Sequence, residues 1–361
     1  MADFNINHIT GKQGQQGTVL AGITTVSSTG AMRIPNGPTT HRGGRGRAVY
    51  NIGGGSPYFN TLNYITIAST GNGADFGDLT QLGKGGAGTG SNSTRGVFAG
   101  GDVSPTNTSG IDYVTISSLG GASDFGDLTE NVRYVSTAAD STRSVFMGGL
   151  TKPSDAIVTT IQYITTATTG DSSDFGNLEK GQWLGGSACS PTRGVMMGGR
   201  APGETNVCQY ITIQTKGDAQ DFGDLTRANS YLPSGIMSST TRGVCGSGYD
   251  GSNNTNTIDY ITIATTGNAT DFGDMTRATR ALSAMSSTVR GVWAGGRNQS
   301  PGAMDNVIEY VTIASAGNST DFGDTTAAAG WNEGLSDCHG GIGEKYGIFI
   351  IRNTYSRFNK I

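Results

Sequence analysis

Short apolar runs recur along the chain, and each belongs to a block that repeats every 47 to 50 residues. One run in each block begins with Arg and ends in glycine, as in Arg95–Gly101 (RGVFAGG). In the next run, exemplified by Ile258–Ile263 (IDYITI), alternate residues would point to opposite faces of a strand, and both faces carry apolar residues. Such short runs, rich in β-branched and aromatic residues, favour strands that are covered on both faces.

A third recurring element is the sequence Asp-Phe-Gly-Asp, which we interpret as a further strand. Its copies begin at Asp75, Asp124, Asp174, Asp221, Asp271 and Asp321, with Asn replacing the last Asp in the third copy. Turn sequences such as Thr266-Gly267-Asn268 separate it from the run before. With the small-residue stretch that opens each block, this gives four strands per repeat. A period of this length with four strands is typical of the blade of a β-propeller.

The repeats resemble kelch repeats in several residues. These are the double glycine that ends an apolar strand, the aromatic residue in the next strand, and a later Leu225-Thr226-Arg227 stretch. The resemblance covers about residues 33–352 and implies an all-β, kelch-like β-propeller. Phe stands in Asp-Phe-Gly-Asp where kelch blades often carry Trp.

The termini suggest how the ring closes. The segment Tyr346–Ile351 matches the Arg-led strands, and Leu20–Ser28 matches the strand that should follow it. We therefore expect seven blades, with N- and C-terminal strands sharing the last blade, which removes open sheet edges. Six blades are the alternative. The expected organisation is an N-terminal arm at 1–17, a propeller at 18–352 and a tail at 353–361.

Composition narrows the class of protein. Gly accounts for 59 of 361 residues and charged residues for 14%, which fits many tight turns and a surface of Ser, Thr and Asn. The net charge of −4 differs from the basic charge expected of a protein that binds nucleic acid. Four scattered Cys form no Cys-x-x-Cys pair, and neither a signal peptide nor an apolar membrane segment is present. We expect a chain made in a cytoplasm, without membrane insertion.

The sequence offers no convincing catalytic set. His8, His41 and His339 lie in unrelated contexts. Asp337, Cys338 and His339 are adjacent, and neighbours on a strand point to opposite faces, so we expect no metal site there. The repeated Asp and Arg are interpreted as ties within and between blades; calcium bound between the repeated carboxylates is a weaker alternative. We expect no enzyme activity, catalytic residue, metal or cofactor.

Variation among the repeats collects on one face of the expected propeller. Connections from the second to the third strand, and from the outer strand to the next blade, differ in length and content, whereas the other turns are near copies. Binding residues often lie on such loops. Exposed aromatic residues there would suit stacking on a sugar or a protein patch. The candidate binding residues are Tyr58, Phe59, Trp183, Tyr231 and Trp331. Drift in unconstrained loops would give the same variation.

A second resemblance lies near the N-terminus. The stretch Gly14–Gly44, which contains Ala31–Thr39 (AMRIPNGPT) and Arg42-Gly43-Gly44, is similar to the lead-in of bacteriophage tail and fibre proteins. The whole chain resembles glycine-rich propeller proteins of marine phages, notably those that infect cyanobacteria. The resemblance implies a structural virion protein, tail-associated or capsid-decorating, whose arm contacts other virion proteins and whose variable face contacts a host glycan or protein. A free carbohydrate-binding lectin is the alternative, and a kelch-type oxidase or glycosidase a third.

Overall fold

The fold is that of an all-β propeller. The computed structural model describes residues 25–26, 32–35, 46–52, 59–82, 85–103, 105–299, 302–342 and 346–349, and these ranges contain strands and turns but no helix. No membrane-spanning helix is found among them. The chain divides into two compact units, 44–343 and the pair of terminal segments 1–43 and 344–361. The expected boundaries at 17 and 352 fall outside the described residues.

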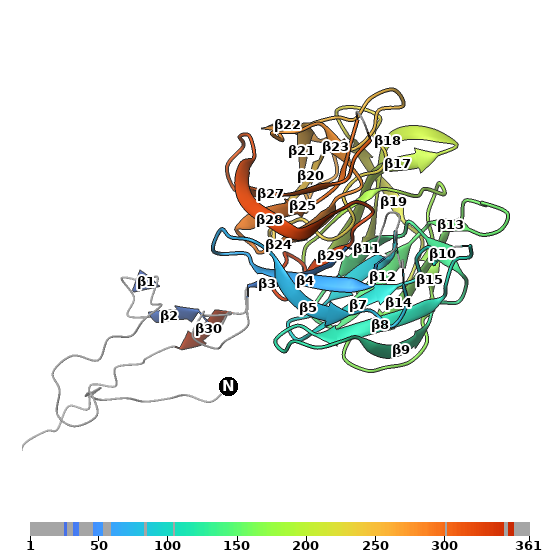
Figure 1. The fold of residues 1–361 in the computed structure, drawn as a ribbon, viewed down its shortest axis with the longest axis horizontal. Helices are drawn as coiled ribbons and strands as arrows, with labels where there is room; N and C mark the ends of the chain where they lie inside the picture. Colours follow the sequence, from blue (N-terminus) through green and yellow to red (C-terminus); the bar gives the residue numbers. More distant parts are fainter. Residues whose placement is uncertain are drawn as a thin grey trace, which may run out of the picture. The chain divides into compact units, whose positions relative to one another are not determined.

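Six blades make up the unit 44–343, and Figure 1 shows their sheets arranged around one axis. Innermost strands are β29 (Gly334–Ser336), β6 (Gly88–Ser91), β11 (Ser136–Ala139), β16 (Gly186–Cys189) and β24 (Ser283–Ser286). Second strands are β3 (Arg47–Asn51), β7 (Arg95–Ala99), β12 (Arg143–Met147), β17 (Arg193–Ala201), β20 (Arg242–Gly246) and β25 (Arg290–Ala294).

The outer half of each blade is formed by the Tyr-Ile-Thr-Ile and Asp-Phe-Gly-Asp segments. Third strands are β4 (Thr61–Thr66), β8 (Gly110–Thr115), β14 (Thr160–Thr165), β18 (Gly203–Thr212), β21 (Thr257–Thr262) and β27 (Asp305–Thr312). Outer strands are β5 (Ala74–Asp78), β9 (Ser123–Asp127), β15 (Ser173–Asn177), β19 (Gln220–Asp224), β22 (Thr270–Asp274) and β28 (Thr320–Ala329). Two short antiparallel pairs, β10 (Val132–Arg133) with β13 (Leu150–Thr151) and β23 (Thr279–Arg280) with β26 (Arg297–Asn298), extend the variable loops.

The structure has six blades, which was the alternative to the expected seven. The sheet of the first blade has the order β29-β3-β4-β5, so a single C-terminal strand completes three N-terminal ones. Closure by both ends of the chain is thus present, but within a ring of six. The match at Leu20–Ser28 contributes instead to a separate three-stranded sheet, in which β1 (Thr25–Val26) pairs with β2 (Met32–Pro35) and β2 pairs with β30 (Tyr346–Phe349). Within the described ranges, the third and outer strands make six pairs, one for each blade, and no such pair remains for a seventh.

Each blade is tied to the next by the repeated arginine. The Arg193 guanidinium lies 4.2 Å from the centre of the Tyr210 ring and donates to the carbonyl oxygen of Ile263 in the following blade at 3.0 Å. The same two contacts recur six times, with donation distances of 2.9 to 3.4 Å, for Arg47, Arg95, Arg143, Arg193, Arg242 and Arg290. These bonds confirm the interpretation of the arginines as ties between blades.

The Asp-Phe-Gly-Asp motif is structural. Phe76 is buried, with its ring 6.2 Å edge-on from that of Tyr64, whereas Asp75 is exposed. Gly77 has φ +145°, and a Cβ there would come within 2.4 Å of the Gly120 carbonyl oxygen of the next blade. The glycine is therefore required by the close approach of two blades, and the phenylalanine by the core between them.

Candidate functional site

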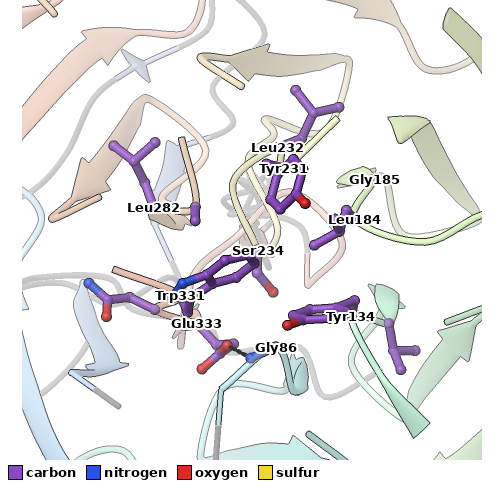
Figure 2. Close-up of a pocket in the computed structure, with 13 residues that line it drawn as sticks. Gly86, Tyr134, Leu184, Gly185, Tyr231, Leu232, Ser234, Leu282, Trp331 and Glu333 are labelled. Carbon is purple, nitrogen blue, oxygen red and sulfur yellow. Dashed lines mark hydrogen bonds between the residues drawn. The ribbon is translucent and has the colours of Figure 1, made fainter. Parts of the chain in front are cut away.

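One residue per blade, just before the innermost strand, has a left-handed backbone. The six are Gly86, Tyr134, Leu184, Tyr231, Ala281 and Trp331, with φ between 53° and 69°. Five of them are not glycine, although this region is unfavourable for residues with a side chain. All six line a cavity at the propeller axis (Figure 2). This end of the axis lies on the face that carries the variable loops, which we call the variable face.

Backbone hydrogen bonds between neighbouring blades hold this conformation. The amide of Trp331 donates to the Ala281 carbonyl oxygen at 2.8 Å, and the amide of Ala281 donates to that of Tyr231 at 3.0 Å. The series continues through Leu232 and Leu184 to Tyr134, whose amide donates to the Gly86 carbonyl oxygen. The amide of Gly86 donates to Oε1 of the buried Glu333, which closes the ring (Figure 2). The backbone around the axis is therefore fixed before any ligand arrives.

This ring holds Tyr134, Tyr231 and Trp331, and two further aromatic side chains lie beside them. We call the five residues the axial aromatic cluster: Tyr134, Trp183, Tyr231, Tyr249 and Trp331. Ring centres lie 5.4 Å apart for Tyr134–Trp331 and 5.3 Å for Tyr231–Trp331. Trp183 lies 5.6 Å from Tyr134 and 6.5 Å from Tyr231, and Tyr249 lies 6.0 Å from Tyr231. All five are partly exposed. Burial raises the pKa of the Tyr134 hydroxyl, so this group stays neutral at physiological pH.

The cavity beneath the cluster is small, with room for about 30 Å³. That volume suits a water molecule or two and excludes a sugar ring or an amino-acid side chain. In the fifth blade, the segment from Tyr231 to Arg242 is two residues longer than the equivalent segment from Tyr134 to Arg143 in the third blade. It contains Ser234, which lines the cavity and whose backbone bridges to Ser283 and Glu333. Any larger ligand at this end of the axis must therefore lie on the aromatic rings.

Three arginines accompany the cluster. Arg133 lies 4.8 Å from the Tyr134 ring, Arg200 lies 5.7 Å from Trp183, and Arg280 lies 5.1 Å from Tyr231 and 4.7 Å from Tyr249. Cations over aromatic faces are stabilised by the ring quadrupole. Tyr, Trp and Arg are also the residues most enriched at binding hot spots of proteins.

At the opposite end of the innermost strands lies a turn at residues 337–342, where the Gly340 amide donates to the Ser238 carbonyl oxygen at 2.9 Å. Asp337 accepts the amides of Gly46 and Arg47 through Oδ1, at 2.8 and 3.1 Å. His339 is buried with Nε2 3.1 Å from the Ser91 carbonyl oxygen, and its Nδ1 accepts the Gly341 amide. This pattern assigns the proton to Nε2. Asp337 and His339 are thus held by separate partners.

The cysteine whose thiol contacts this histidine, Cys189, is inert. Cys189 Sγ lies 3.7 Å from His339 Nδ1, and Sγ donates to the Ala139 carbonyl oxygen at 3.1 Å. Burial raises the pKa of the Cys189 thiol to about 12 and lowers that of His339 to about 4. A thiol so far from ionising is a poor nucleophile. Within the described ranges, no group of three or more His, Cys, Asp or Glu residues could hold a metal ion.

The structure brings together three of the five candidate binding residues. Trp183, Tyr231 and Trp331 belong to the axial aromatic cluster. Phe59 is 37% exposed in the loop between β3 and β4. Tyr58 lies outside the described residues.

Sequence reasoning missed Tyr249, Arg280 and Glu333 as parts of this site. Alignment of the repeats could have shown that Tyr134, Tyr231 and Trp331 share one position with Gly86. Tyr249 and Arg280 come from different loops, and only the fold places them beside Tyr231.

Comparison with known proteins gives no identity. The sequence matches no protein-family model and no curated protein.

Proposed function

We propose that this chain is a non-catalytic binding protein that uses its variable face, centred on the axial aromatic cluster, to attach to a host surface or a protein. The observation that carries the proposal is the rigid ring that holds Tyr134, Tyr231 and Trp331 in left-handed conformations. Such strain persists where the surrounding structure imposes it, and it often marks ligand sites. Preorganised aromatic groups bind with less loss of conformational entropy.

The proposed setting is a bacteriophage virion, as a kelch-like component of the tail or a decoration of the capsid. Support comes from the sequence: the lead-in at Gly14–Gly44 is similar to those of phage tail and fibre proteins. The chain would be made in the host cytoplasm and join other virion proteins through its N-terminal arm. No cofactor is required for this role.

Mass spectrometry of purified particles of the virus that encodes the chain tests the setting. The chain should co-purify with the particles through a density gradient at a constant ratio to a capsid protein. Gold-labelled antibody against the propeller should mark the tail or the capsid surface. Absence from particles that retain their other structural proteins would overturn the virion assignment.

A free lectin is the second candidate, favoured by the partly exposed Trp and Tyr rings of the axial aromatic cluster. It shares the binding face and differs in its setting. Saturable binding to a glycan array by the isolated chain, together with its absence from virions, would favour the lectin.

A further inference from the structure

Arg280 differs from the other two arginines beside the axial aromatic cluster. Arg133 is paired with Asp102 at 2.6 Å and with Asp155 at 2.9 Å. Arg200 Nε lies 3.6 Å from Glu204 Oε1. Among the described residues, the guanidinium of Arg280 has neither an ion pair nor a hydrogen bond, although its Nε is buried.

The carboxylates beside the other two arginines are already bound by donors. Lys152 joins Arg133 at Asp102, and these two cations lower the pKa of Asp102 although burial acts to raise it. Glu204 accepts from Ser230 at 3.3 Å in addition to its contact with Arg200. Neither of these two carboxylates is paired with Arg280, whose guanidinium can therefore bind an external anion.

The position of Arg280 is fixed by its neighbours. It lies on β23, which pairs with β26, so its backbone is held by a ladder. The guanidinium stacks on Tyr231 and Tyr249, whose rings are nearly perpendicular to each other. A planar guanidinium held in this way can bind a carboxylate through two parallel hydrogen bonds.

The shape and charge of the site indicate which class of anionic ligand fits. A protein partner that anchors one side chain needs a pocket, and the 30 Å³ cavity is too small for one. A polyanion such as nucleic acid would require a cluster of cations along its backbone, and the net charge of the chain is −4. A pyranose ring with one carboxylate can lie on the aromatic rings and reach Arg280.

We propose that the axial aromatic cluster and Arg280 bind an acidic saccharide, with a uronic acid unit stacked on Tyr231 and Trp331 and its carboxylate on Arg280. The inference rests on the binding face assigned under the proposed function and supplies its ligand class. Recognition needs no chemical step: the sugar displaces water from the rings, and the carboxylate replaces water at the guanidinium.

Titration calorimetry of the full chain with trigalacturonate tests the proposal. The matched probe is its methyl ester, which has the same rings without the charge. We expect saturable binding of trigalacturonate and roughly ten- to hundredfold weaker binding of the ester, the loss that a charged hydrogen bond produces. Trigalacturonate should also change the tryptophan fluorescence. Because Trp293 is buried in the core, the change can be assigned to Trp183 and Trp331.

Two arginine variants separate a specific contact from general charge. Arg280→Gln should weaken trigalacturonate binding as much as methylation does and leave binding of the ester unchanged. Arg227→Gln is the control, because Arg227 is exposed in the segment that follows β19 and stacks on no ring of the cluster. It should bind trigalacturonate like the parent chain.

Trp331→Gly removes one stacking ring without imposing strain, because Gly86 occupies the equivalent position in another blade. It should weaken both probes. Equal binding of the two probes, an unaffected Arg280→Gln variant, or no binding of trigalacturonate would overturn the saccharide assignment, and the last result would favour a protein partner. None of these outcomes alters whether the chain is present in virions, so the two proposals fail separately.

Discussion

In each of the six blades, one residue that lines the axial cavity has the same backbone conformation, with a positive φ. Ala281 has φ 56°, is almost fully buried, and both donates and accepts in the ring of backbone bonds. Its neighbours in the ring, Tyr231 and Trp331, have the same conformation with much larger side chains. The conformation is therefore imposed by the ring and not by the preference of each residue.

Substitution of Ala281 tests this directly. Ala281→Val should destabilise the protein by about 1–3 kcal/mol, because a β-branched side chain is especially unfavourable at positive φ. Ala281→Gly should change stability by less than about 1 kcal/mol, since relieved strain offsets the greater freedom of the unfolded chain. Urea unfolding measures both, and equal losses for Val and Gly would contradict an imposed left-handed backbone.

The burial of His339 should make the stability of the protein depend on pH. Its pKa is about 4 in the folded chain, lowered by burial, against about 6.5 when unfolded. Between these values the unfolded state binds more protons, so the contribution of His339 is complete above pH 6.5 and is lost as the pH falls toward 4. The loss amounts to about 3 kcal/mol.

The matched variant for this prediction is His339→Gln, compared with the parent chain by urea unfolding from pH 7 to pH 4. The two chains share all other titrating groups, so the difference between their unfolding free energies isolates His339. That difference should shrink as the pH falls. A constant difference would show that His339 is not buried in its neutral form.

At the scale of the element, each blade is one copy of a unit that is incomplete alone. The repeated arginine stacks on a tyrosine within its own blade and donates to a carbonyl of the next. The outer-strand glycine permits the close approach that brings the two blades together. Blade contacts are thus nearly equivalent around the ring, including the contact between the sixth and first blades, where Arg290 donates to Ile67.

Equivalence of these contacts can be measured with two substitutions. Arg193→Ala and Arg290→Ala should each destabilise the propeller by about 1–3 kcal/mol, the combined worth of a hydrogen bond and a cation–π contact. Arg290→Lys should recover part of the loss, because an ammonium keeps the ring contact but lacks the fork. A much smaller loss for Arg290 than for Arg193 would show that the closing contact is weaker.

At the scale of the whole molecule, the ring depends on one short strand. β29 supplies the innermost strand of the first blade and pairs with β3 through Gly334, Leu335 and Ser336. Leu335 packs in the core between the first two blades, and Ser336 Oγ donates to Ser286 in the sixth. Loss of β29 would leave an open sheet edge and unfilled space beside two blades.

Fragments of the chain test this closure. Residues 44–343 should unfold in one cooperative thermal transition, because they form a compact unit with all six blades. Residues 44–332 lack β29 and should show no such transition, or a much lower Tm. Equal Tm values for the two fragments, measured by calorimetry, would mean that closure by β29 contributes little to stability.

The amino-acid sequence by itself determined the repeat, the strands within it and the propeller class. The alternation of residues with a period of two predicts strands, and the period of 47 to 50 residues predicts repeated units. Both patterns can be recognised in the sequence without knowledge of tertiary contacts. The structural role of Asp-Phe-Gly-Asp also followed from repetition, and the close contact at Gly77 supplies its physical cause.

Tertiary structure decided the blade count and the make-up of the candidate site. Strand-like segments near both termini matched the repeat, yet pairing partners settle whether such strands enter the ring, and β2 and β30 pair with each other. Left-handed angles at Tyr134, Tyr231 and Trp331 come from hydrogen bonds between blades. Arg280 reaches Tyr231 and Tyr249 because the fifth and sixth blades pack side by side and bring their loops together. Contacts between distant segments place these residues at one end of the axis. Such contacts cannot be predicted from the local pattern of residues.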